Sequence, residues 1–351
     1  MNRRTTASVV GFGLLVVIWL FISLLPVPYV IYSPGPTVNL LAKDGSNDIV
    51  RVNGDAKVYR DKGALRLLTV VPSGPDDKVN LAQAIFAWVR PDQAVYQKAD
   101  IYPPEETADR MQQEGQVDMV DSQDSAVASA LRELGYKFGT SVQVIGVMRG
   151  GPGDGALEVH DRLVSVDGAK VRSIEGVVNQ IKSVTPGSKV TLVVERRDER
   201  QTLKIKTVKS QDDPKSAALK ITIGRGYEFP IEVNLRINSG IGGPSAGTMF
   251  ALAIYDTLTP GSLTGGSDIA GTGTIDGKGA VGGIGGIQQK LVAAQRDGAK
   301  LFLAPAANCD EVVDGPYDSN KMRVARIKTL HDAIDVLNKW RTNHDVKLPR
   351  C

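Results

Sequence analysis

Histidine is scarce in this sequence, with only His160, His331 and His344 among 351 residues. None of them lies in a motif-like setting, so we do not expect a histidine-based catalytic triad. No H-E-x-x-H zinc motif occurs, and the Gly277-Lys278 pair lacks the flanking residues of a phosphate-binding loop. We therefore expect neither a metal nor a cofactor. If the protein is an enzyme, we expect its reaction to proceed without ATP.

Cysteine is also rare in this sequence, and the net charge is small. The two cysteines, Cys309 and Cys351, are too few for a disulfide framework. They could form one bridge outside the cytoplasm, but the terminal position of Cys351 makes a native bridge the less favoured alternative. The net charge of +3 is small and the basic residues are dispersed, which argues against nucleic acid as a partner.

One long uncharged run stands near the N-terminus. Residues 7–25 carry no charge, which is about the length of a membrane-spanning helix. A cleaved signal peptide is the alternative, but the run is longer than a usual signal core and no A-x-A site follows. Arg3 and Arg4 precede the run, and the next basic residue is Lys43. This asymmetry predicts a cytoplasmic N-terminus and an extracytoplasmic remainder.

The most informative stretch runs from Gly240 to Ala294 and contains a candidate nucleophile, Ser245. Gly242 and Gly243 allow close approach of the backbone to a ligand, and Pro244 suits the start of a helix. From Ala246 onward, apolar residues recur at helical spacing. We therefore expect Ser245 at a helix N-terminus, where free N–H groups can serve as an oxyanion hole.

A serine hydroxyl needs a base, and Lys290 is the best-placed candidate. Ile287, Leu291 and Ala294 share its helical face, which predicts apolar surroundings for the amine. Desolvation disfavours the ammonium form and lowers the pKa of a lysine. The alternatives are a glycine-rich turn before a core helix and a surface lysine with a buried stem.

The residues around Ser245 and Lys290 closely resemble the proteolytic domain of Lon proteases, which are Ser-Lys peptidases. The resemblance covers residues 219–337 and is strongest in three motifs: G-P-S-A-G at 243–247, A-G-T-G at 270–273 and G-G-I-Q-Q-K-L-V-A-A at 285–294. It implies that Ser245 is the nucleophile, Lys290 the base and Thr272 a hydrogen-bond partner of the amine. Many Lon enzymes carry an acidic residue three positions before the serine, where this sequence has Gly242.

An earlier segment, residues 136–208, resembles a bacterial PDZ domain. Its hallmark G-D-x-[IL]-x-x-[VI]-[ND]-G segment is present at 160–168, with His160 in place of the usual glycine. PDZ domains bind extended peptides by adding them to the edge of a sheet. The peptide-binding loop could lie at Gly135, Tyr136, Lys137 and Phe138, although Gly135 also fits a helix cap.

The whole chain resembles the membrane-anchored PDZ-Lon proteases of bacteria, of the YlbL type. We expect an α+β multidomain fold: a cytoplasmic tip and anchor (1–25), a β-rich spacer (26–121), a PDZ domain with a leading helix (122–210) and a Lon-type α/β peptidase domain (211–351). In the spacer we predict strands at 49–52, 57–60 and 65–71, and a turn-rich exit from the membrane at 32–36.

The resemblance implies an ATP-independent serine endopeptidase that cleaves unfolded or PDZ-captured proteins, and a homo-oligomer such as a hexameric ring. One rival is a non-catalytic membrane-tethered PDZ scaffold or holdase with a vestigial peptidase fold. The presence of Ser245, Thr272 and Lys290 together favours catalysis. A second rival, an enzyme of the signal-peptidase kind, would need a nucleophile close to the membrane, whereas Ser245 is far from the anchor in sequence.

Overall fold

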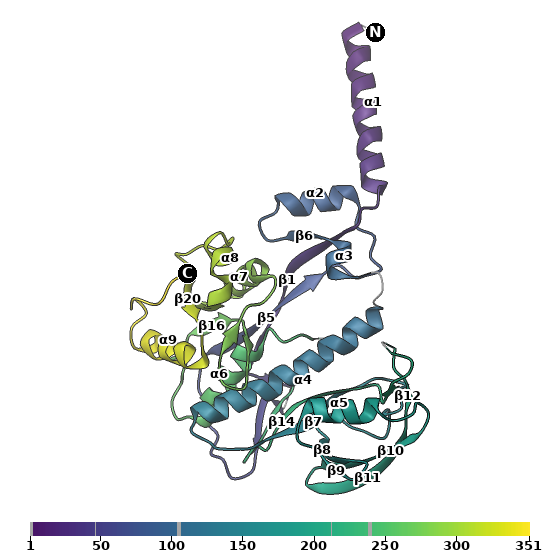
Figure 1. Ribbon diagram of the computed structural model, residues 1–351. Helices are drawn as coiled ribbons and strands as arrows, with labels where there is room; N and C mark the ends of the chain where they lie inside the picture. The colour runs from purple at the N-terminus through teal and green to yellow at the C-terminus, as the bar shows by residue number, and fades with distance from the viewer. Residues whose placement is uncertain (1–2, 46, 104–106, 212, 238–240) are drawn as a thin grey trace.

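The computed structural model describes residues 3–351 except 46, 104–106, 212 and 238–240. Gly240, the first residue of the stretch singled out above, lies outside the described residues. A single N-terminal helix projects from a body made of two sheets and their helices (Figure 1). The helices are α1 Arg3–Leu24, α2 Leu81–Val89, α3 Lys98–Ile101, α4 Ala108–Glu133, α5 Ile174–Lys182, α6 Gly247–Leu258, α7 Ile287–Arg296, α8 Cys309–Val313 and α9 Leu330–Thr342.

The larger sheet has the strand order β20-β19-β16-β5-β1-β6. Strands β5, β16, β19 and β20 are parallel, and β1 is antiparallel to β5 and β6 on either side of it. These strands are β1 Tyr29–Asn39, β5 Ala64–Pro72, β6 Ala94–Gln97, β16 Asp268–Gly271, β19 Leu301–Pro305 and β20 Arg323–Ile327.

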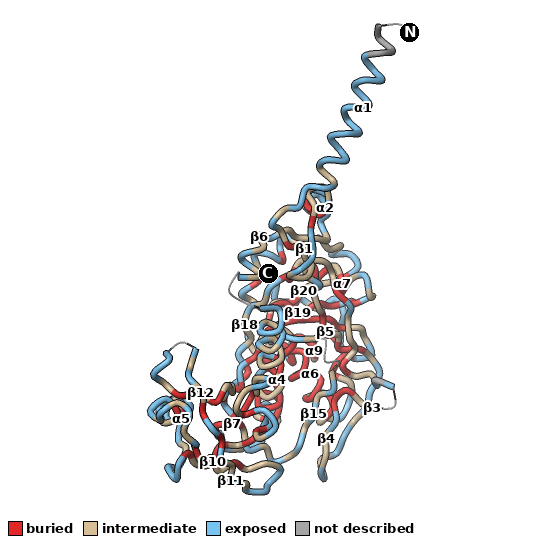
Figure 2. The backbone as a smooth tube through the Cα atoms, turned by 90° about the vertical axis from the view of Figure 1, so that its right-hand side faces the viewer, coloured by how far each residue is buried: buried red, intermediate tan, exposed pale blue. Residues whose placement is uncertain are grey.

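Both faces of this sheet are covered, as expected for parallel strands. Alternate residues of β19 point into different cores: Leu301 and Leu303 join α4, α6 and α9, whereas Phe302 and Ala304 join α7 and α8. The buried residues form a continuous band through this part of the body (Figure 2). The prediction of an α/β domain for the Lon-type segment is confirmed.

The second sheet belongs to the PDZ segment and has the order β11-β10-β8-β7-β14, with β9 beside β8. Its separate apolar core includes Val177 and Ile181 of α5. The strands are β7 Thr140–Val147, β8 Arg162–Val166, β9 Ala169–Lys170, β10 Lys189–Arg196, β11 Glu199–Lys206 and β14 Ile221–Tyr227. The remaining short strands are β2 Lys43–Asp44, β3 Asn47–Asp48, β4 Val50–Asn53, β12 Val208–Lys209, β13 Ala217–Ala218, β15 Glu232–Leu235, β17 Thr274–Ile275 and β18 Val281–Gly282.

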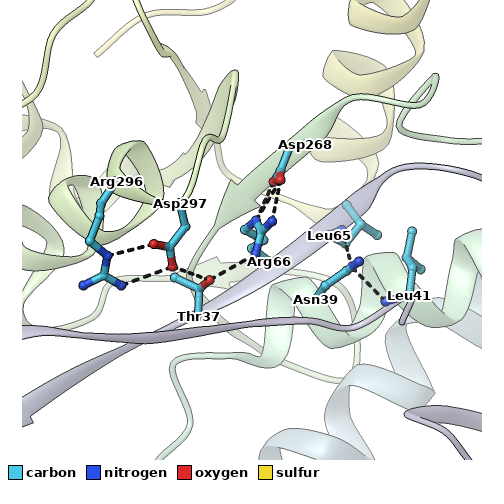
Figure 3. A network of polar contacts seen from close by, with 8 residues as sticks. All are labelled: Thr37, Asn39, Leu41, Leu65, Arg66, Asp268, Arg296 and Asp297. Carbon is cyan, nitrogen blue, oxygen red and sulfur yellow. Dashed lines mark hydrogen bonds and ion pairs between the residues drawn. The ribbon is translucent and has the colours of Figure 1, made fainter. Parts of the chain in front are cut away.

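The segment predicted as a spacer is built into the peptidase sheet. Strands β1 and β5 lie between β16 and β6, and β4 pairs with β15. Figure 3 shows polar contacts that hold this arrangement. Arg66 on β5 forms a two-pronged ion pair with Asp268 on β16, and Thr37 on β1 donates a 2.8 Å hydrogen bond to Asp297 at the end of α7. Strands from residues 26–121 and from residues 211–351 therefore share one sheet, whereas β14, from the second of these ranges, belongs to the PDZ sheet. Both findings differ from the predicted division.

Three local predictions differ from the structure. Residues 32–36, expected as a turn, continue β1, which accommodates its two prolines through a bulge between Pro34 and Thr37. Residues 57–60 are not a strand. The leading helix expected within residues 122–210 begins earlier, at Ala108, where the Thr107 hydroxyl caps it. Its first turns are mostly polar and carry no apolar stripe that would have extended the prediction.

The structure pairs Cys309 with Cys351, with 4.8 Å between their Cα atoms, so the expectation that favoured unpaired cysteines is wrong. The C-terminal tail is not loose, because the backbone N–H of Arg326 donates to the carbonyl of Pro349 and Leu348 is buried.

His160, which replaces a usual glycine, has a φ of 72°, in the left-handed region that favours glycine.

Candidate active site

The loop that carries Ser245, the candidate nucleophile, is a tight turn just before α6, and we call it the nucleophile loop. Gly243 has a φ of 87°, which explains the need for glycine there. The first residue of α6 is Gly247 with Ala246 as its N-cap, so Pro244 lies in the turn and does not begin the helix. Ser245 is half-buried and lines a cleft of about 240 Å³ together with Lys290, Met119 and residues 67–71 of β5.

Lys290 reaches Ser245 from the other face of the sheet. Its Nζ lies 3.0 Å from the Oγ of Ser245 and 3.2 Å from the Oγ1 of Thr272. The Lys290 side chain is only 2% exposed. Burial lowers the pKa of Lys290 from its ordinary value to about 8. The predicted apolar surroundings are present, because Ile287, Leu291 and Ala294 are fully buried.

Thr272 connects the two ends of the site. Its hydroxyl donates a 3.0 Å hydrogen bond to the carbonyl oxygen of Ser245 and accepts one from the Lys290 amine. The same serine carbonyl accepts a 2.9 Å bond from the N–H of Gly273. Thr272 lies in the short break between β16 and β17, and it is almost completely buried. These bonds fix the backbone of Ser245 relative to the amine.

The long helix α4 holds the nucleophile loop, which sequence reasoning missed. The carbonyl of Gly115 accepts a 2.8 Å bond from the N–H of Gly243, and the hydroxyl of Ser122 donates to the carbonyl of Pro244 at 3.1 Å. The N–H of Gly243 is therefore occupied. Among the described residues, the N–H groups of Ser245 and Ala246 make no backbone bond and remain available to an oxyanion.

The close approach of the nucleophile loop to the carbonyl of Gly115 also explains the glycine at position 242. A Cβ atom added to Gly242 would lie 3.2 Å from the carbonyl oxygen of Gly115, which is tighter than nine in ten real Cβ contacts, so the backbone of α4 would have to shift. An acidic side chain at this position would therefore press against α4. The only signal in the sequence was Gly115 itself, an unusual residue inside a helix.

The three histidines have partners elsewhere. His160 contacts Asp124, His331 contacts Glu133 and His344 stacks on Trp340. None of these contacts involves Ser245 or Lys290.

The predicted peptide-binding loop at 135–138 has structural roles. Gly135 and Tyr136 end α4 by donating to the carbonyls of Arg132 and Leu131, a Schellman motif. Phe138 packs edge-on against Tyr227 and Phe229, with the Arg132 guanidinium over its ring. Lys137 stays exposed. These contacts favour the helix-cap alternative, and peptide binding by this loop stays a prediction.

Two parts of the chain match the models of known protein families. Residues 237–339 match the family described as "Lon protease (S16) C-terminal proteolytic domain", and residues 115–207 match "PDZ domain". The Lon protease of Paraburkholderia phytofirmans is 41% identical over 93 residues, which are 26% of this chain and 11% of that protein. Peroxisomal Lon protease homolog 2 of Caenorhabditis briggsae is 38% identical over 96 residues, 27% of this chain and 12% of that protein.

The chain thus contains a PDZ domain followed by a Lon-type S16 proteolytic domain, as the sequence predicted, together with a helix apolar enough to cross a membrane. It spans only 11% to 16% of the length of the curated Lon proteases that it matches. Among solved structures, the PDZ domain of an SdrC-like protein from Listeria monocytogenes is 21% identical, with a TM-score of 0.22, and covers 24% of this chain and 86% of that one.

The buried amine gives a measurable titration. We expect the Lys290 amine to lose its proton near pH 8, because burial disfavours the ammonium form. Replacing Thr272 by valine removes an acceptor of the ammonium, so the midpoint should fall further, by about one pH unit. NMR of protein whose lysines are labelled at the carbon next to the amine would follow the titration in the parent and in Thr272→Val. The signal that disappears in Lys290→Met is the signal of Lys290. Titration of Lys290 with the surface lysines, near pH 10, would contradict the burial argument.

Proposed function

We propose that the protein is a serine endopeptidase that uses Ser245 and Lys290 as a catalytic dyad. The observation that carries this proposal is the 3.0 Å contact between the serine hydroxyl and a buried lysine amine. The similarity of the surrounding domain to Lon proteases supports the same reaction class.

The proposed chemistry is acyl transfer. The neutral Lys290 amine accepts the hydroxyl proton as the Oγ of Ser245 attacks a peptide carbonyl carbon. The N–H groups of Ser245 and Ala246 stabilise the oxyanion. Lys290 then donates its proton to the departing amide nitrogen, which breaks the peptide bond and leaves an ester on Ser245. Water attacks this ester with Lys290 as base, which releases the acid and restores the serine. No step uses ATP.

The neighbouring PDZ domain suggests how substrates are held. We infer that it captures extended or unfolded polypeptide and so raises the local concentration near the cleft. Helix α4 supports this coupling, because it packs against β7 and β14 of the PDZ sheet and also holds the nucleophile loop.

Assembly into a ring of several copies would further restrict access to the cleft. Measurement of the mass of the protein in detergent would give the number of subunits.

We also propose that α1 anchors the protein with its catalytic part outside the cytoplasm. Residues 7–24 form an apolar helix with a mean hydropathy of 2.5, and none of these residues is buried. The Cys309–Cys351 bridge supports the same side, because disulfides persist in oxidising compartments.

The dyad is tested by single substitutions. Ser245→Ala and Lys290→Met should each lower the hydrolysis of an unfolded protein by about 10⁴-fold or more, since members of a catalytic unit fail together. Lys300→Met, which changes an exposed lysine just beyond α7, is the matched control and should retain activity. Thermal melting should show that both inactive variants stay folded.

Near-full activity of Lys290→Met would remove the lysine from the mechanism. Equal and negligible hydrolysis by the parent and by Ser245→Ala would favour the non-catalytic scaffold.

The orientation is tested through the cysteines. In intact cells, Cys309 and Cys351 should resist alkylation until a reductant is added, because the oxidising side keeps them paired. Cys351→Ser provides the reference for a free thiol at Cys309. Thiols of the parent that react without reduction would place the catalytic part in the cytoplasm.

A further inference from the structure

Helix α2 is apolar on nearly all sides and yet lies at the surface. Its nine residues, Leu81–Val89, include one polar side chain, Gln83, which is used in a capping box with Asn80. The small buried residues Ala84 and Ala87 face the body of the protein, where α2 packs on β1 and β6. A helix that is hydrophobic all round is normally buried on every side. The other faces of α2 therefore need a partner.

Large side chains make up these other faces. Ile85 is 47% exposed, Phe86 62%, Trp88 75% and Val89 74%. At 100° per residue, Ile85, Phe86 and Val89 lie opposite the buried alanines, and Trp88 lies on the flank. We call these four residues the α2 patch. Contiguous exposed apolar side chains of this size mark an interaction surface.

The position of the α2 patch identifies the partner. The backbone N–H of Leu81, the first residue of α2, donates a 2.9 Å bond to the carbonyl of Leu25, the residue directly after α1. The N–H of Val27 donates to the carbonyl of Val79 at 2.9 Å, and Pro26 bridges to Asn80. Helix α2 therefore begins where α1 ends, and it runs sideways from the foot of α1 along the top of the body (Figure 1).

We propose that α2 lies in the surface of the bilayer, with the α2 patch inserted among the lipids. This proposal rests on the proposed anchor, because a membrane-spanning α1 brings its end, and hence the start of α2, to the lipid surface. Short helices with aromatic apolar faces insert about 5–10 Å into this boundary, and tryptophan is enriched there.

The contact is apolar and does not depend on anionic lipid. Lys78 and Arg90 flank the helix, but Asp76, Asp77 and Asp92 lie beside them, and Arg90 is paired with Asp92 at 2.7 Å. The guanidinium of Arg90 also lies over the Phe86 ring. We therefore expect the same insertion into neutral and anionic bilayers.

Insertion of α2 would fix the direction in which the catalytic cleft faces. Strand β1 follows α1, pairs with β6 just after α2, and continues to Pro36, which lines the cleft beside Ser245. One helix through the membrane leaves the body free to swing. A second contact through α2 holds the body in one orientation to the bilayer.

Tryptophan fluorescence of the full chain in phosphatidylcholine vesicles tests the proposal, with brominated lipid as quencher. In Trp19→Phe, only Trp88 and the buried Trp340 emit. Brominated lipid should remove most of the Trp88 emission, whether or not phosphatidylglycerol is added. Trp19→Phe/Trp88→Phe should show no such loss. The same double variant carrying Tyr136→Trp, an exposed indole beyond the far end of α4, should also show none.

Equal quenching with and without Trp88 overturns the proposal. Shielding of Trp88 from aqueous acrylamide without quenching by brominated lipid also overturns it, because protein, such as a second copy of the chain, would then cover the patch. Membrane insertion of α1 is measured separately, from the quenching of Trp19 by brominated lipid in the Trp88→Phe variant. Failure of the α2 contact and failure of the anchor therefore give different results.

Discussion

The candidate site depends on the burial of one amine. Lys290 lies in a nearly dry position, where its amine contacts the hydroxyls of Ser245 and Thr272. Among the described residues that line the cleft, none is a carboxylate that could hold the ammonium form. With a pKa of about 8 in the folded chain and about 10.4 when unfolded, the folded state binds fewer protons between these values. Folding stability should therefore rise with pH across that window, and below pH 8 the fold bears the full cost of the buried amine.

Segments that precede the peptidase domain in sequence build much of this environment. Strand β5 supplies one wall of the cleft, β1 is tied to the end of α7 through Thr37 and Asp297, and α4 supplies the carbonyl of Gly115 that holds Gly243. Helix α4 also packs against β7 and β14 of the PDZ sheet, so it connects that sheet to the loop that carries Ser245. The same architecture links the foot of α1 to the cleft through β1.

The local settings of Ser245 and Lys290 could be predicted from the sequence because their signals are local. Ser245 follows a glycine-rich turn, and Lys290 lies on an apolar helical face, so both patterns are visible within a few residues. The shared sheet was not predictable in this way, because pairing of β5 with β16 joins residues about 200 positions apart. The roles of Gly115 and Ser122 were missed for the same reason. The exposure of the apolar helix α2 was not predictable either, because it depends on which residues the folded body leaves uncovered.

The most direct test of the account is the pH dependence of kcat/KM for a peptide substrate. Only the neutral Lys290 amine can accept the serine proton, so the rate should rise with pH through about 8 and then level off. A rate that increases only near pH 10, where an ordinary lysine titrates, would contradict the claim that burial makes Lys290 the base.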